Sequence, residues 1–246
     1  MRPDVLGLSP GTRLAVVSPH LDDAVLSLGA TIARAARAGV PVVVATALAC
    51  DPESAAETKG WDARAGFATE GEAARARREE DAAACAVLGA TPVWLPFGSV
   101  DYERHGDETD VAAAVVQAIA DAEAVMLPGT PLSHPDHDWL VRALLARGFS
   151  YRRVGFYAEQ PYSARSTVSH DVAHWLGAPL ELEQASASMR DLLAKRRALR
   201  CYRSQLPLLA LGGSGLLNLE RHLYSEARAG GEAFAWLPAG APTGRP

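Results

Sequence analysis

The sequence predicts an α/β fold in which a mostly parallel sheet carries helices on both faces. Short apolar runs rich in β-branched residues alternate with longer segments of helical periodicity from Leu14 to Ala158, which is the pattern of parallel strands joined by crossover helices. Two helical segments end at Gly39 and Gly89, the residue type that helix C-termini favour. After Gln160 the alternation stops, so an antiparallel or helical C-terminal part is expected.

The first two strands and the helix between them follow from three adjacent segments. Leu14–Ser18 is a short apolar run that predicts a buried strand. Ala24–Ala38 has apolar residues at helical spacing and stops at Gly39. Val40–Leu48 is apolar almost throughout, which is typical of a strand that is covered on both faces.

The middle of the chain continues the alternation around two polar loops. The loop Cys50–Gly71 contains Pro52 and several glycines, and polar loops of this length in compact domains usually carry function. A charged amphipathic helix is predicted over Glu72–Leu88 and a strand over Pro92–Phe97. Gly98–Asp107 is the second polar loop.

Two further helix–strand pairs complete the alternating region. Helices are predicted over Glu108–Asp121 and Asp136–Arg147, and strands over Ala124–Leu127 and Arg153–Ala158. Because neighbouring strands of a parallel sheet need crossover connections, these helices are expected to cover its faces.

Beyond Gln160 the pattern is less regular. Ser163–Gln184 is mixed and predicts antiparallel edge strands, while Ala185–Gln205 predicts a helix. The basic segment 195–197 of that helix is expected to face solvent, and Leu206–Gly215 is expected to form an apolar, glycine-rich loop.

No internal repeat and no clear linker divides the 246 residues. One domain over residues 1–246 is therefore predicted. It comprises a core of about 12–160, a C-terminal elaboration of about 161–238, and a Pro/Gly-rich tail over 239–246 that is expected to be flexible.

Composition narrows the function classes. The formal net charge of −5 argues against a partner such as nucleic acid or an anionic membrane, since both favour a dominant basic face. The three cysteines lack C-x-x-C spacing, which predicts reduced thiols and a cytoplasmic location. No apolar run approaches the roughly 20 residues that span a bilayer, and the first residues lack the regions of a signal peptide.

Ionisable side chains gather at two predicted strand-to-helix junctions. His20, Asp22 and Asp23 follow the first strand, and His134 and His137 follow the fourth. Because parallel strands deliver their carboxyl ends to one edge of a sheet, the two clusters are expected to meet there. His20, Asp23 and His137 would make a His₂-carboxylate set with one open position, which is the arrangement of catalytic zinc. The alternative is that each cluster only caps its helix or lies at the surface.

The same two clusters resemble the signatures of a known family. The stretch 18–27 resembles the P-H-x-D-D signature of the PIG-L (LmbE-like) deacetylases, and 134–137 resembles their H-P-D-H signature. The helical stretch 77–90 resembles their R-x-x-E…A…LG stretch, so that the resemblance covers roughly 14–160. It implies one Rossmann-like deacetylase domain with the metal at the carboxyl edge of the sheet. The implied activity is zinc-dependent hydrolysis of N-acetyl groups, mostly on amino sugars and sugar-bearing natural products.

The resemblance also implies a role for each residue. His20, Asp23 and His137 would bind the metal, Asp22 would be the general base, and His134 would protonate the leaving amine or stabilise the oxyanion. Zinc lowers the pKa of bound water to near 7 and polarises the carbonyl, so Asp22, beside a ligand, is well placed to take a proton. The cofactor is therefore expected to be Zn²⁺, although Fe²⁺ or another divalent ion suits the same ligand types.

One position near the signatures has two interpretations, and three positions depart from the family pattern. Asp136 either orients a ligand histidine from the second coordination shell or only serves the helix N-terminus. Ala24 stands where the family signature usually has Glu, and Leu21 replaces its commoner proline. Leu132 lies where sugar-deacetylating members have a carbonyl-polarising tyrosine. These departures leave the chemistry in place but weaken transfer of a specific substrate.

Substrate contacts are predicted at loop residues that follow the strands. Trp61 is suited to stack on a sugar face and Arg64 to bind hydroxyl groups, and the other candidates lie after the second and fifth strands. The predicted contacts are Asp51, Trp61, Arg64, Tyr157 and Glu159.

The sequence therefore predicts a metal-dependent hydrolase that removes an N-acyl group, N-acetyl above all, from an amino sugar or a sugar-bearing small molecule. The predicted partner is this small-molecule substrate, without nucleic acid or a membrane span. The alternatives are an amidase of a larger amide, such as a thiol–sugar conjugate, and a non-catalytic metal-binding member of the family. A nucleotide-binding domain is disfavoured because no G-x-G-x-x-G follows the first strand.

Overall fold

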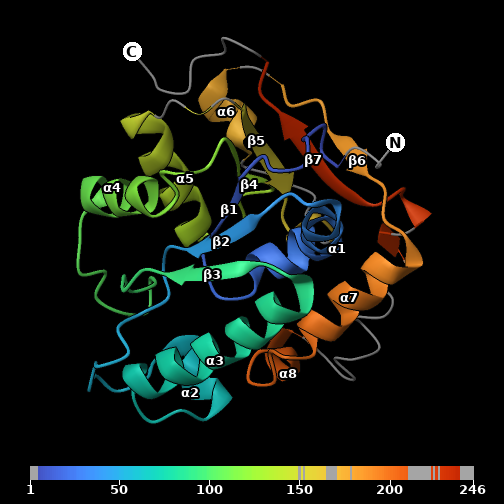
Figure 1. The fold of residues 1–246 in the computed structure, drawn as a ribbon. Helices are drawn as coiled ribbons and strands as arrows, with labels where there is room; N and C mark the ends of the chain where they lie inside the picture. Colours follow the sequence, from blue (N-terminus) through green and yellow to red (C-terminus); the bar gives the residue numbers. More distant parts are fainter. Residues whose placement is uncertain are drawn as a thin grey trace.

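One sheet of seven strands, in the order β3-β2-β1-β4-β5-β7-β6, forms the centre of the described part of the chain (Figure 1). The structure, a computed structural model, describes residues 5–148, 151, 153–164, 171–177, 179–209, 223, 225–226 and 228–238. The strands are β1 (Leu14–Ser18), β2 (Val42–Thr46), β3 (Thr91–Trp94), β4 (Ala124–Thr130), β5 (Arg153–Ala158), β6 (Glu183–Ala185) and β7 (Glu232–Trp236).

Strand β1 lies in the middle of the sheet, between β2 and β4. The chain first runs outward from β1 through β2 to β3, then returns to β4 on the other side of β1 and continues to β5, and all of these neighbours are parallel. Strand β7 pairs antiparallel with β5, and β6 pairs antiparallel with β7. The predicted sheet and its antiparallel C-terminal part are thus confirmed. The strand order reverses between β1 and β4, which is where open α/β sheets bind ligands.

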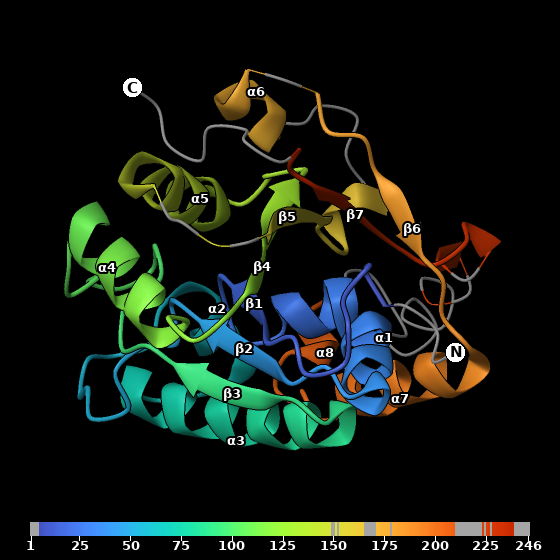
Figure 2. The same cartoon turned by 45° about the horizontal axis from the view of Figure 1, so that its top comes forward.

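Helices cover both faces of the sheet. Helices α1, α3 and α7 pack together on one face, and α4 packs against α5 on the other (Figure 2). The helices are α1 (Asp23–Ala38), α2 (Gly60–Ala65), α3 (Glu70–Leu88), α4 (Glu108–Ala118), α5 (Pro135–Arg147), α6 (Val172–Leu176), α7 (Met189–Leu199) and α8 (Leu206–Leu209), with a 3₁₀ turn, η1, at Tyr162–Ala164.

The two faces of β1 contribute to two separate hydrophobic cores. Leu14 and Val16 pack with the apolar residues of α1 and α3. Ala15 and Val17 pack with those of α4 and α5. Because successive side chains of a strand point to opposite faces, a strand that is covered on both sides must be apolar throughout, and β1 is.

Several element boundaries differ from those predicted. Strands Leu14–Ser18 and Arg153–Ala158 are confirmed, but the predicted strand Val40–Leu48 extends only over Val42–Thr46. Its first part contains Pro41, which has no N–H for the sheet. At its other end Leu48 forms an isolated bridge with Pro96 instead.

Other segments differ from the predicted elements in content or in length. The loop Cys50–Gly71 holds the short helix α2, and helix α3 already begins at Glu70 because Thr69 accepts a hydrogen bond from the Glu72 amide. The predicted helix Ala185–Gln205 was too long at both ends. Helix α7 starts only after Ser188, which forms a capping box with Asp191. Strand β7 was not predicted at all.

Lys195 lies in the core, so the prediction that segment 195–197 faces solvent was wrong for this residue. Its side chain is fully buried, and its Nζ donates to Glu226 and to Glu232 at 2.7 Å each. Glu232 also accepts from the amides of Ala30 and Thr31, beyond a break in α1 at Leu28. Two carboxylates that are distant in sequence therefore compensate the buried charge.

Two predicted features fall partly or wholly outside the described residues. Leu206–Leu209 of the predicted apolar loop forms α8, while 210–215 and the tail 239–246 are not described. The division of one domain into a core and an elaboration stays a prediction, although β6 and β7 join the same sheet as β1. In the described ranges, no helix combines the length and apolar character needed to cross a bilayer.

Candidate metal centre and active site

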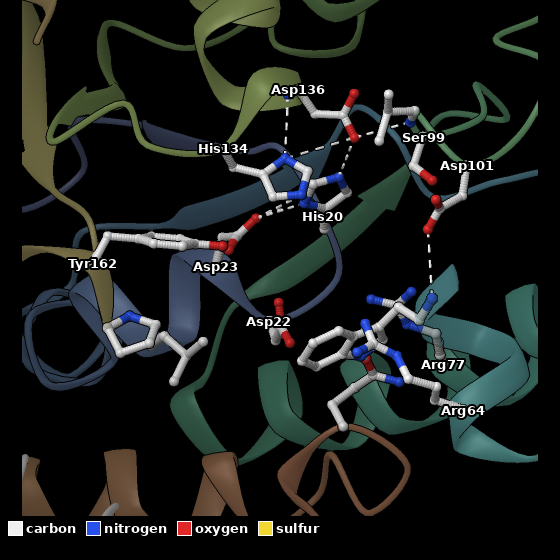
Figure 3. Close-up of a pocket in the computed structure, with 15 residues that line it drawn as sticks. His20, Asp22, Asp23, Arg64, Arg77, Ser99, Asp101, His134, Asp136 and Tyr162 are labelled. Carbon is white, nitrogen blue, oxygen red and sulfur yellow. Dashed lines mark hydrogen bonds and ion pairs between the residues drawn. The ribbon is translucent and has the colours of Figure 1, made fainter. Parts of the chain in front are cut away.

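The two predicted clusters meet at the carboxyl edge of the sheet (Figure 3). One cluster comes from the turn between β1 and α1, and the other from the connection between β4 and the start of α5. A third contribution, Glu159, follows β5 directly. The three segments come from adjacent strands, as the topology requires.

The turn after β1 is shaped by its own polar side chains. Ser18 Oγ donates to the His20 carbonyl at 2.6 Å and accepts from the Ala24 amide at 3.0 Å. Asp23 Oδ2 accepts from the His20 amide at 2.8 Å. Asp22 has a φ of 131°, which is costly for a residue other than glycine and is often found at functional sites. Local hydrogen bonds thus hold both carboxylates at the start of α1.

Three donor atoms converge on one point. His20 Nδ1 lies 3.3 Å from Asp23 Oδ2, and His137 Nε2 lies 3.2 Å from the same oxygen. The two ring nitrogens are 3.2 Å apart. A tetrahedral ion with bonds of about 2.0–2.1 Å has ligand–ligand edges of about 3.3–3.4 Å, so His20, Asp23 and His137 fit such an ion.

Both histidines of this set are oriented from behind by buried carboxylates. His20 Nε2 lies 2.9 Å from Asp136 Oδ2, and His137 Nδ1 lies 2.8 Å from Glu159 Oε2. With these outer nitrogens donating, the inner nitrogen of each ring presents its lone pair to the shared point. This arrangement is usual around metal-binding histidines. Glu159, predicted to contact substrate, is only 2% exposed and lies behind His137.

His134 is the N-cap of α5 and differs from the other two histidines. Its Nδ1 accepts a hydrogen bond from the Asp136 amide at 3.2 Å, so Nε2 carries the ring proton. Burial and the neighbouring His20 and His137 lower the pKa of His134 to about 4. The ring is therefore neutral near pH 7 and offers an N–H donor. A three-histidine site is sterically available, since the ligand atoms of all three rings lie within 4.8 Å, but the tautomer of His134 disfavours it.

Asp22 lines the pocket next to the donor set and is only 8% exposed. Burial and the charge of Asp23 raise the pKa of Asp22 to about 8, while the charge of Arg77 opposes that rise. Arg77 lines the same pocket and pairs with Asp62 at 3.2 Å. Arg77 begins the R-x-x-E stretch of the family resemblance.

The pocket has a volume of about 360 Å³ and a second wall opposite the donor set. Trp61 and Arg64 of α2 lie in this wall, with the Arg64 guanidinium 5.0 Å from the Trp61 ring centre. Trp61 Nε1 donates to Gln205 at 2.5 Å, and its amide donates to Asp101 at 3.4 Å. Three segments distant in sequence thus form this wall. Figure 3 shows Arg64 and Arg77 beyond Asp22, away from the histidines.

The structure places the remaining predicted contacts outside the pocket lining. Asp51 accepts from the Glu53 amide at 2.9 Å within a turn. Tyr157 is fully buried, and its hydroxyl donates to the Val17 carbonyl at 2.9 Å. Tyr162, in contrast, does line the pocket, with its ring centre 5.6 Å from that of His137.

The three positions that depart from the family pattern are all buried, and Leu21 is only 2% exposed. Ala24 belongs to the core between α1 and the sheet, and Leu132 belongs to the core on the opposite face. None of the three residues is among those that line the pocket. The departures therefore leave the donor set unchanged.

Comparisons with known proteins identify the family of the chain. The PIG-L family model, described as GlcNAc-PI de-N-acetylase, matches residues 15–147. An antimicrobial reagent pseudoaglycone deacetylase of known structure is 29% identical, with a TM-score of 0.75 over 92% of this chain and 96% of that chain. The zinc-inhibited form of teicoplanin deacetylase is 25% identical, with a TM-score of 0.71 over 92% and 97% of the two chains.

A more distant structure supports the fold alone. The N,N'-diacetylchitobiose deacetylase of Pyrococcus horikoshii is 17% identical, with a TM-score of 0.60 over 92% of this chain and 84% of that chain. No curated protein sequence matches the chain.

Proposed function

Because the chain belongs to the PIG-L family of GlcNAc-PI de-N-acetylases, we propose that it is a metal-dependent deacetylase of an amino sugar carried by a natural product. The observation that carries this proposal is the convergence of one carboxylate and two carboxylate-oriented histidines on one point. The similarity to deacetylases of teicoplanin and of another antimicrobial pseudoaglycone supports the substrate class.

We propose Zn²⁺ as the ion and His20, Asp23 and His137 as its ligands. One carboxylate and two imidazoles are a ligand set of catalytic zinc, and they leave a position open for chemistry. When bound, such an ion makes water more acidic and polarises an amide carbonyl. Asp136 and Glu159 hold the two rings in the required tautomers.

Asp22 is the proposed general base. It lies in the pocket beside Asp23 but takes no part in the donor set. Because its pKa is raised to about 8, the ionised form that accepts the proton of the attacking water becomes more abundant as the pH rises toward 8. The new C–O bond forms as the amide carbonyl becomes tetrahedral. When the C–N bond breaks, the departing nitrogen takes that proton back from Asp22, which restores the carboxylate.

His134 is the proposed donor to the oxygen on which negative charge develops. Its Nδ1 is engaged by the Asp136 amide, so its Nε2–H is fixed as a donor toward the pocket. A preorganised donor of this kind stabilises the transition state more than the substrate. Of the two roles predicted for His134, this geometry favours the oxyanion role over protonation of the amine.

The opposite wall is suited to a sugar ring. Trp61 provides an aromatic face, and Arg64, Arg77 and Asp101 provide donors and acceptors for hydroxyl groups. A cavity of about 360 Å³ is at the lower end of the range for small-molecule sites, which fits one sugar unit with its acyl group. The rest of a larger scaffold would lie outside the pocket.

The test is release of a primary amine by Zn²⁺-loaded protein from a panel of N-acylated compounds. The panel includes N-acetylated amino sugars, glycosylated natural products with N-acyl sugars, and an amide between a sugar and a thiol-containing acid. Asp22→Asn is the control, because it preserves shape while removing the base.

Release from the first two classes that requires Asp22 supports the proposal. Release from the third class alone would make the protein an amidase of larger amides. A protein that binds Zn²⁺ but releases no amine from any class would be a non-catalytic member of the family.

A further inference from the structure

The carboxylate of Asp136 receives three donors from two parts of the chain. Its Oδ2 lies 2.9 Å from His20 Nε2 and accepts from the Val100 amide at 3.0 Å. Its Oδ1 accepts from the Arg104 guanidinium at 2.5 Å. Asp136 itself is completely buried. One carboxylate therefore joins a residue of the donor set to the loop between β3 and α4.

Arg104 lies over an aromatic ring while it pairs with Asp136. Its guanidinium carbon lies 4.1 Å from the ring centre of Trp139 on α5. The side chain is 22% exposed, and its second terminal nitrogen is buried without a hydrogen-bond partner among the described residues. Removing a guanidinium from water in this way is costly unless its charge is compensated. Asp136 provides that compensation.

The loop that carries Arg104 also forms part of the pocket. Ser99, Val100 and Asp101 line it, and Asp101 accepts from the Trp61 amide of the opposite wall. Docking of this loop on Asp136 therefore sets the position of that wall. The same docking fixes the carboxylate that orients His20.

We propose that Arg104 is a positioning residue that couples the metal centre to the pocket wall, an inference that rests on the metal centre of the proposed function. By holding Asp136, Arg104 keeps the His20 ring turned with Nδ1 toward Asp23 and His137. By the same contact it holds the loop that carries Ser99 to Asp101. Binding of the metal ion and the fixed position of this pocket wall then stabilise each other.

The experiment measures the affinity for Zn²⁺ alone, by competition with a chromophoric chelator, in the native protein and in Arg104→Met. Methionine keeps an apolar stem over Trp139 but cannot donate to Asp136. Loss of an outer partner of a metal-binding histidine typically weakens metal affinity by about 10–100-fold. Because Asp136 keeps its other two donors, we expect a loss of about 10-fold.

The matched control is Arg142→Met. Arg142 also lies on a tryptophan, 5.4 Å from the ring centre of Trp175, and pairs with Asp138 of the same helix at 3.1 Å. It is not among the residues that line the pocket, so Zn²⁺ affinity should be unchanged. Arg104→Lys keeps the charge without the planar fork, so its affinity should lie between the native value and that of Arg104→Met.

A second readout separates coupling from general destabilisation. At saturating Zn²⁺, Arg104→Met should recover most of kcat while KM stays raised, because the wall remains displaced. The proposal is overturned if Arg104→Met, or Arg104→Lys should the first variant not fold, binds Zn²⁺ as tightly as the native protein. A native protein that binds no Zn²⁺ would overturn the proposed metal centre together with this coupling.

Discussion

The two ends of the pocket are built in different ways. The end that holds the proposed metal ligands, the metal end, comes from two short stretches, 18–23 and 134–137. Their local hydrogen bonds place the side chains directly. The opposite wall comes from α2, the loop 99–101 and Gln205, which meet only through tertiary contacts. We infer that short local stretches position the residues that carry the chemistry. The fit to a particular substrate depends on segments that are distant in sequence. Variants at the two ends should therefore fail in different ways.

The largest effect is expected at Asp22. Asp22→Asn should lower kcat by about 10²–10⁴-fold, the usual contribution of a general base. Its Zn²⁺ content should be unchanged, because Asp22 is not one of the three converging donors. Steady-state kinetics with elemental analysis test this expectation. Near-native kcat would remove Asp22 from the mechanism.

Lys195 tests whether the metal end depends only on local sequence. Lys195→Met removes the buried cation that pairs with both Glu226 and Glu232 and should cost about 3–5 kcal/mol of stability. The lysine stem crosses α1 at Gly29, where an added Cβ would come within 2.8 Å of Lys195 Cγ. Since α1 begins with Asp23, the variant shows how far the position of Asp23 depends on contacts between segments that are distant in sequence.

The pH dependence of this contribution has a definite sign. Burial lowers the pKa of Lys195, but the charges of Glu226 and Glu232 raise it overall above its ordinary value of 10.5. Its stabilising contribution is therefore complete below pH 10.5 and is lost as the pH rises through the higher folded-state pKa. Chemical denaturation of Lys195→Met and of the exposed-site control Arg190→Met at pH 7 measures the stabilising contribution of Lys195 where it is complete. Equal stability of the two variants would contradict this role.

His134 should show a smaller effect, confined to turnover. His134→Asn keeps a side chain that can cap α5 but removes the Nε2–H donor. Loss of one oxyanion donor typically lowers kcat by about 10²–10³-fold, and KM should change little. A change in KM alone would mean that His134 only binds substrate.

The smallest effect is expected at the opposite wall. Arg64 is exposed and stacks on Trp61, so Arg64→Ala should remove one hydrogen bond to substrate. At roughly 0.5–1.5 kcal/mol per bond, KM should rise about 2–10-fold with kcat preserved. A fall in kcat of about 2–10-fold at constant KM would contradict the division of roles between the two ends of the pocket.

The sequence predicted where the polar side chains of the metal end gather, because that information is local. Two motifs at strand-to-helix junctions, together with the parallel topology, were enough to bring His20, Asp23 and His137 together. The outer carboxylate Glu159 follows the adjacent strand β5 and was therefore named, although with a different role. Local pattern could give its position but not the direction of its side chain.

The remaining features depend on partners that are far apart in the chain. Arg104 reaches Asp136 across 32 residues, and Lys195 reaches Glu232 across 37. Nothing in the spacing around either cation marks its distant partner. Strand β7 was missed for the same reason, since its pairing with β5 is a long-range contact.

The identity of the third ligand tests the central claim most directly. The measurement is the Zn²⁺ content per chain of Asp23→Asn and His134→Asn, after equilibration with the same buffered Zn²⁺ concentration. We predict that Asp23→Asn loses the ion and that His134→Asn keeps it, because only Asp23 shares the convergence point with His20 and His137. Retention in Asp23→Asn with loss in His134→Asn would instead establish a three-histidine site and contradict the account.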